Sequence, residues 1–93
     1  MEIYQYYYIL YLVDYLNEKI YISNTDPITY SPNISYAKLY ETEANVDNDI
    51  LDIHDRISEI INKTDITHFY KAKIKMHSFG KTVDSIMWEE QII

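Results

Sequence analysis

The sequence contains no cysteine, one glycine and two prolines among its 93 residues. The lack of cysteine excludes a disulfide framework, a thiolate zinc site, an iron–sulfur cluster and a cysteine nucleophile. A single glycine, Gly80, is too few for the glycine-rich loop that cradles a phosphate group. The apolar run from Tyr6 to Val13 has eight residues. A membrane-spanning helix takes roughly 20 residues, so this run is too short to be one.

The first residues carry no basic stretch of the kind that opens a secretory signal peptide. We therefore expect a soluble, cytoplasmic protein. The composition, with 47% hydrophobic and 15% aromatic residues, argues against intrinsic disorder. The length indicates a single domain covering residues 1–93, near the lower end of the usual size range.

The N-terminal part of the sequence predicts strands joined by turns. Residues 2–13 are rich in Tyr, Ile, Leu and Val, and both faces of their alternating pattern are apolar. This predicts a strand that is central or covered on both sides, with a helix as the competing interpretation. A turn at residues 17–18 leads to a second strand over residues 19–23. Residues 24–33 hold both prolines and predict a loop, and for residues 34–40, ambiguous between strand and helix, we favour a short strand.

Residues 45–63 are the clearest predicted helix. Asn45 or Asp47 is a suitable N-cap, because a short polar side chain can accept a hydrogen bond from the first free backbone N–H groups. Apolar side chains recur at helical spacing and predict one buried stripe. The stripe consists of Val46, Ile50, Ile53, Ile57, Ile60 and Ile61.

Residues 65–77 alternate again and predict a strand with one buried and one solvated face. A turn at residues 78–81, where Gly80 supplies a positive φ, leads to a returning strand over residues 82–88, and residues 89–93 are expected to fray. The face expected to be buried carries Ile66, His68, Tyr70, Ala72, Ile74 and Met76, and the face expected to be solvated carries Thr67, Phe69, Lys71, Lys73, Lys75 and His77.

Together these elements predict an α+β fold. It is a two-layer sandwich in which one helix packs on an antiparallel sheet of four to five strands. The predicted chain order is β-β-(β)-α-β-β, and the bracketed strand is residues 34–40.

The net charge of −7 is concentrated in one segment. Residues 41–59 hold seven acids and one base, Arg56, whereas residues 63–81 hold five lysines and one acid. On a helix, Asp52, Asp55 and Glu59 would lie about 5–6 Å apart along one side. Such a row resembles the phosphates of a nucleic acid and could occupy a basic groove of a partner protein; the alternative is an ordinary solvated helix face. The predicted partner-binding residues are Glu41, Glu43, Asp47, Asp49, Asp52, Asp55 and Glu59.

Two other surfaces are candidates for binding. Lys71, Lys73 and Lys75 could contact phosphates while Phe69 and nearby tyrosines stack on bases, although the acidic net charge argues against direct nucleic-acid binding. The eleven tyrosines suit a protein interface, and assembly of a homodimer through the Tyr-rich N-terminal strand is the alternative function.

The sequence offers no arrangement of residues for catalysis. His54, His68 and His77 lack the spacing of a zinc site, and the serines lack a nucleophile-elbow context. Exposed carboxylates on a helix would keep near-normal acidity, whereas a general acid needs a raised pKa and a cleft. We therefore expect a binding protein that is not an enzyme and uses no metal or cofactor.

In size, acidity and element order the chain resembles small single-domain proteins encoded by phages and other viruses, among them anti-CRISPR proteins. The elements concerned are the hairpin over residues 3–23, the segment Ile34-Ser35-Tyr36-Ala37-Lys38-Leu39-Tyr40, the helix and the C-terminal hairpin. The resemblance implies a protein that inhibits a host nucleic-acid-handling or defence complex, such as a CRISPR effector, in the host cytoplasm. The implied partner is a host protein with a basic surface.

Overall fold

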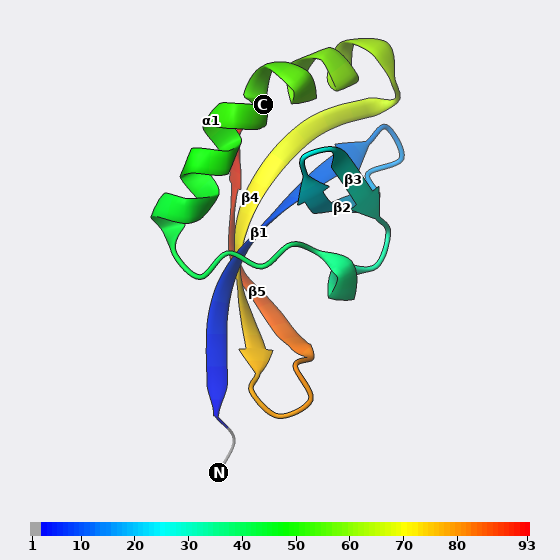
Figure 1. The fold of residues 1–93 in the computed structure, drawn as a ribbon. Helices are drawn as coiled ribbons and strands as arrows, with labels where there is room; N and C mark the ends of the chain where they lie inside the picture. The colour runs from blue at the N-terminus through cyan, green and yellow to red at the C-terminus, as the bar shows by residue number, and fades with distance from the viewer. Residues whose placement is uncertain (1–2) are drawn as a thin grey trace.

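The computed structural model describes residues 3–93, which form one antiparallel sheet with one helix packed against it (Figure 1). The strands lie in the order β3-β2-β1-β4-β5, so β1 is central and β3 and β5 are edges. This confirms the predicted α+β fold with an antiparallel sheet and one packed helix. The elements are β1 (Tyr4–Asp14), β2 (Lys19–Thr25), β3 (Ile28–Ser31), a 3-10 helix (Ile34–Tyr36), α1 (Glu43–Lys63), β4 (Ile66–His77) and β5 (Val83–Gln91).

Strand β1 lies in the middle of the sheet, as its two apolar faces predict. Its ladder with β4 runs from Tyr4, opposite His77, to Asp14, opposite Ile66. β2 pairs only with residues 11–13 of β1, and side chains 9–13 are buried whichever face they point to. The competing helical interpretation of this segment is therefore wrong.

Both predicted hairpins are present, although the first turn is centred on Tyr15 and Leu16 instead of residues 17–18. Each turn has a local cause. After β1, the Asp14 carboxylate accepts hydrogen bonds from the backbone N–H groups of Leu16 and Glu18, both at 2.9 Å, and Asn17 adopts a φ of 65°. After β4, Gly80 adopts a φ of 81°, which a residue without Cβ reaches at no steric cost.

The predicted third strand lies in a different place. Residues 28–31, predicted as loop, form β3 and pair with β2, whereas residues 34–36 form a single 3-10 turn instead of a strand. The Asn33 side chain starts this turn by accepting a hydrogen bond from the Ser35 N–H at 3.0 Å. The chain then becomes extended, and Tyr40 forms an isolated bridge with Tyr8.

Helix α1 begins two residues earlier than predicted. Thr42 is the N-cap, and its side chain accepts a hydrogen bond from the Asn45 N–H at 3.2 Å, so neither Asn45 nor Asp47 caps the helix. The predicted apolar stripe is confirmed, with Ile60 and Ile61 only partly buried at its end. The core between α1 and the sheet consists of Leu10, Leu12, Ile22, Tyr40, Val46, Ile50, Ile53, Ile57 and Phe69.

The assignment of β4 faces needs one correction. The face with Phe69 and Lys71 is not solvated throughout, because α1 crosses this end of β4: Phe69 is 0% exposed and Lys71 6% exposed. The opposite face is buried at Ala72, Ile74 and Met76, as predicted. At the other end of the chain, residues 89–91 continue β5 rather than fraying, and the Ile92 N–H donates to the Phe69 carbonyl at 2.7 Å.

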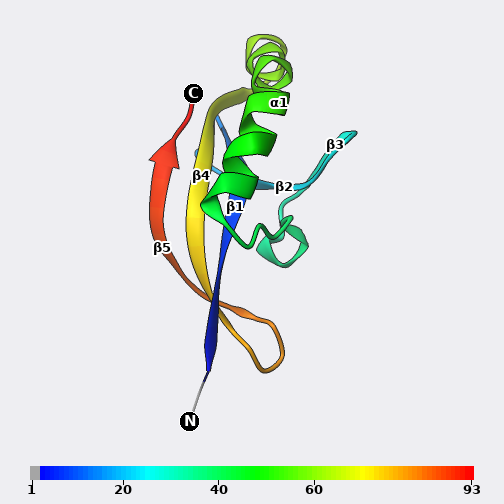
Figure 2. The same ribbon diagram turned by 60° about the vertical axis from the view of Figure 1, so that its left-hand side comes forward.

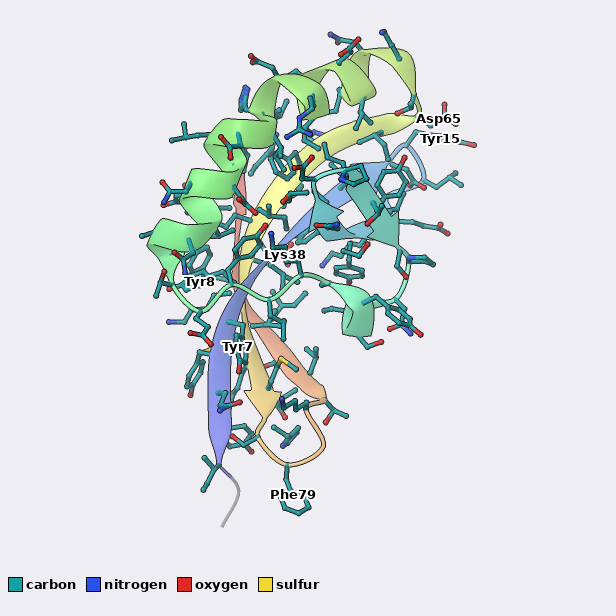
Figure 3. All side chains as sticks on the ribbon, in the orientation of Figure 1. Tyr7, Tyr8, Tyr15, Lys38, Asp65 and Phe79 are labelled. Atoms are coloured by element: carbon teal, nitrogen blue, oxygen red, sulfur yellow. The ribbon has the colours of Figure 1, made fainter. Side chains whose placement is uncertain are left out.

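The helix covers only part of the sheet. The beginning of β1, the end of β4 and the start of β5 extend beyond it as an arm, and both views of the ribbon show this (Figures 1 and 2). Phe79 projects from the β4–β5 turn at the tip of the arm (Figure 3) and is 98% exposed. The molecule is accordingly elongated, with principal extents of 47 × 28 × 22 Å.

Candidate partner-binding surfaces

The structure divides the predicted acidic residues into two groups. Asp47 and Asp49 point from α1 toward lysines of the sheet and of the segment before α1, and Glu43 lies beside one of these lysines. Asp52, Asp55 and Glu59 lie on the exposed side of α1, and Glu41 is exposed just before the helix. The seven residues therefore do not form one continuous binding row.

Asp49 is the acceptor at the centre of a hydrogen-bond network. Its Oδ2 accepts from Lys38 Nζ at 3.0 Å, from Tyr40 Oη at 2.5 Å and from Thr25 Oγ1 at 3.1 Å. Lys38 lies in the extended segment that precedes α1 (Figure 3). The network therefore ties that segment and β2 to the first half of the helix, which is a structural task.

The network changes the acidity of two of its members. Burial alone would raise the pKa of Asp49, but the hydrogen bonds from Tyr40, Lys38 and Thr25 outweigh burial and hold that pKa below its usual value of 3.8. For Tyr40, burial and then the hydrogen bond to Asp49 both raise the pKa above its usual value of 10.0. Asp49 is thus ionised and Tyr40 protonated at neutral pH.

This network predicts an acid-dependent loss of stability. A carboxyl group with a lowered folded-state pKa adds stability above its unfolded-state pKa and loses it as pH falls through the folded-state value. The advantage of the wild type over Asp49→Asn in free energy of unfolding should therefore be full at pH 6 and shrink below about pH 4. Urea denaturation at both pH values measures it. A difference that is constant or grows in acid would contradict the assignment.

Lys71 is the second internal charge centre. Its side chain is 8% exposed, and its Nζ lies 2.9 Å from Asp47 Oδ1 and 3.2 Å from Glu90 Oε2. Glu43 Oε1 lies 3.9 Å away. Burial alone would lower the pKa of Lys71, but the hydrogen bonds to Asp47 and Glu90 and the charges of these two carboxylates raise it above 10.5. Lys71 is consequently neutralised within the molecule and is not available to a phosphate group.

On the outward side of α1, two acidic side chains lie apart from the lysine and arginine side chains of the described residues. Within residues 3–93, no lysine or arginine nitrogen lies within 4.0 Å of the Asp52 or Asp55 carboxylate. Asp52 and Arg56 are four residues apart on the helix but do not pair; Arg56 Nη1 instead donates to the Thr25 carbonyl at 3.4 Å. Glu59 and Lys63, which have the same spacing, form an ion pair. Leu51 lies on the same outward side of α1 and is 79% exposed.

A second surface lies on the helix side of the arm, where the sheet is uncovered. We call it the tyrosine–lysine face. Lys73 and Lys75 remain accessible there, but Phe69 is in the core, so the expected stacking of bases on Phe69 is wrong. Alternation along β1 puts Tyr4, Tyr6 and Tyr8 on one face, but it does not predict which β4 residues they meet, because strand register is a property of the fold. The face consists of Tyr4, Tyr6, Tyr8, Lys73, Lys75 and Trp88.

A shallow hollow of about 440 Å³ lies between the C-terminal half of α1 and the β2–β3 turn. Its acidic and basic side chains are equal in number, so it shows no preference for a ligand of one charge. Its lining consists of Asp26, Pro27, Ile28, Arg56, Glu59, Ile60, Lys63 and Thr64.

The three histidines are separate from one another. His54 contacts Asp55, His68 contacts Thr67 and His77 Nε2 lies 3.1 Å from Asp84 Oδ1. Among residues 3–93, no three His, Asp or Glu side chains are arranged so that they could hold a metal ion.

Comparisons with known proteins assign the chain to no family. No family model matches the chain, and searches of curated proteins and of solved structures found no significant match. In the part of the chain that the structure describes, no helix has both the length and the apolar character to span a membrane.

Proposed function

We propose that the chain is a non-enzymatic binding protein that docks on a basic surface of a partner protein through the outward side of α1. The proposal follows the resemblance to small viral inhibitors such as anti-CRISPR proteins, and the partner is then a host nucleic-acid-handling or defence complex in the host cytoplasm. The observation that carries it is a contrast within residues 3–93: lysines neutralise the inner acids Asp47 and Asp49, whereas Asp52 and Asp55 have no lysine or arginine partner there.

An apolar side chain supports protein contact at the same place. Leu51 is 79% exposed in the middle of α1, one turn from Asp47 and one turn from Asp55. A protein interface commonly has an apolar centre within a charged rim, whereas a pure imitation of phosphates needs no leucine. The contact we propose is therefore centred on Leu51, with Asp52, Asp55 and Glu59 meeting arginine or lysine side chains of the partner.

Charge reversal on the outward side should abolish this contact. The variant Asp52→Lys, Asp55→Lys, Glu59→Lys places three cations against a basic surface, and opposing like charges cost several kcal/mol. We expect at least a 100-fold weaker affinity for a partner captured from host lysate with the wild type, measured by biolayer interferometry. The same partner should lose its nucleic acid when the wild type is added and keep it when the variant is added.

A matched variant separates the helix surface from net charge. Glu18→Lys, Asp65→Lys, Glu89→Lys reverses three exposed acids that lie outside α1 and changes the net charge by the same amount. This control should bind within about threefold of the wild type. Equal losses in both variants, or an unchanged affinity in the α1 variant, would refute the proposal.

A further inference from the structure

The tyrosine–lysine face is built from side chains that meet across strands. Tyr6 lies opposite Lys75 and Tyr8 opposite Lys73 in the β1–β4 ladder, and Trp88 lies opposite Lys73 in the β4–β5 ladder. Lys75 Nζ lies 3.9 Å from the Tyr4 ring centroid, and Lys73 Nζ lies 5.5 Å and 5.7 Å from those of Tyr6 and Tyr8. Each lysine is thus held against aromatic rings rather than extended into water.

Within the described part of the chain, Lys73 and Lys75 lack the acidic partners that most of the other lysines have. Among residues 3–93, no carboxylate lies within 4.0 Å of Lys73 or Lys75, whereas Lys19, Lys38 and Lys71 each have at least one. A cation held against a ring keeps N–H donors that can still bond to an anion. The arm therefore offers two ordered positive charges to an anionic ligand, beyond the region where α1 holds its acids.

The rings on this face are accessible as well. Tyr6 is 47% exposed and Trp88 is 38% exposed, and the Tyr8 and Trp88 ring centroids lie 5.9 Å apart. The face of an aromatic ring is electron-rich and repels a carboxylate, but it stacks favourably on a nucleobase. An acidic peptide would therefore gain from the lysines alone, whereas a nucleic acid would gain from the lysines and the rings.

We propose that the tyrosine–lysine face binds a short stretch of single-stranded nucleic acid. Lys73 and Lys75 contact two phosphates, and Tyr6 and Trp88 stack on unpaired bases. Alternate residues of a strand lie roughly 7 Å apart, so these groups lie side by side along an open sheet surface. In a duplex the bases are stacked on one another in the interior, so they cannot stack on these aromatic rings. The inference is independent of the docking of α1 on a protein, because no residue is shared between the two surfaces.

The first test measures binding directly with the full chain. Fluorescein-labelled 12-nucleotide oligo(dT) and oligo(rU), and a 12-base-pair duplex, are titrated with the protein at 50 mM salt and followed by fluorescence anisotropy. We expect saturable binding of at least one single strand and at least tenfold weaker binding of the duplex. With two phosphate contacts, the slope of log K against log salt should be about −1.4. No saturable binding of either single strand, or equal binding of the duplex, overturns the proposal.

The second test assigns the binding to the face. Lys73→Ala, Lys75→Ala should weaken oligonucleotide binding at least tenfold, and Lys19→Ala, Lys63→Ala, which removes the same charge elsewhere, should weaken it no more than twofold. Tyr6→Ala should weaken binding at least fivefold without changing the salt slope, since it removes stacking and no charge. Circular dichroism checks that each variant is folded. Equal losses in the two double variants, or self-association that depends on Lys73 and Lys75 without oligonucleotide binding, overturns the proposal.

Discussion

Replacing Phe69 with alanine should lower the free energy of unfolding by about 3–5 kcal/mol, the usual cost of removing a buried phenyl ring. Phe69 is 0% exposed and packs beneath α1, while its backbone pairs with the C-terminal residues Ile92 and Ile93. A small domain has roughly 5–15 kcal/mol of stability in total, so the variant should lose a large share of it. Guanidinium denaturation followed by circular dichroism measures the loss.

The chain supplies the control for this experiment. Phe79 is 98% exposed at the tip of the β4–β5 turn, and Phe79→Ala makes the same chemical change without opening a cavity. Its effect should stay within about 0.5 kcal/mol. If both phenylalanines cost the same, Phe69 is not in the core, and the solvated position that the alternating pattern indicates would be the right one.

Replacing Lys71 with glutamate should destabilise the domain by about 3–5 kcal/mol, because the change removes a buried cation from its partners and adds a carboxylate among them. Lys71 is enclosed by Asp47, Glu90 and, slightly farther away, Glu43. Urea denaturation at pH 7 measures the loss.

Lys73→Glu is the matched control for Lys71→Glu. Lys73 lies two residues further along β4, on the same face but beyond α1, and has no carboxylate neighbour within 4.0 Å among the described residues. The control should cost less than about 1 kcal/mol at pH 7. A similar loss of stability at both positions would mean that the ion pairs beneath the helix do not make Lys71 more important for folding than Lys73.

Local patterns were sufficient for most of the fold. The helical spacing of Val46, Ile50, Ile53 and Ile57 predicts which side of α1 meets the sheet, and the two-sided apolar pattern of residues 2–13 predicts a central strand. The errors arose where one residue decides between alternatives. Thr42 caps α1 ahead of Asn45, and the Asn33 side chain turns the chain at residues 34–36.

The candidate surfaces were less predictable because they depend on distant residues. The alternating pattern places Phe69, Lys71 and Lys73 on one face of β4. It does not predict which part of that face α1 covers. The separation of Asp49 from Asp52 into internal and outward acids depends on Lys38, which reaches α1 from the preceding segment. Likewise, Tyr8 meets Lys73 only through the register of two strands that lie far apart in the sequence.

The pairing of β1 with β4 also determines the order in which the molecule can fold. The ladder joins Tyr4 to His77, so β1 and β4 pair only after most of the chain has closed into a loop. A fold of such high contact order forms slowly compared with a helical bundle of the same length. During synthesis, the Tyr-rich strand β1 therefore lacks its principal partner until β4 has left the ribosome, and an unpaired apolar strand of this kind is prone to aggregate.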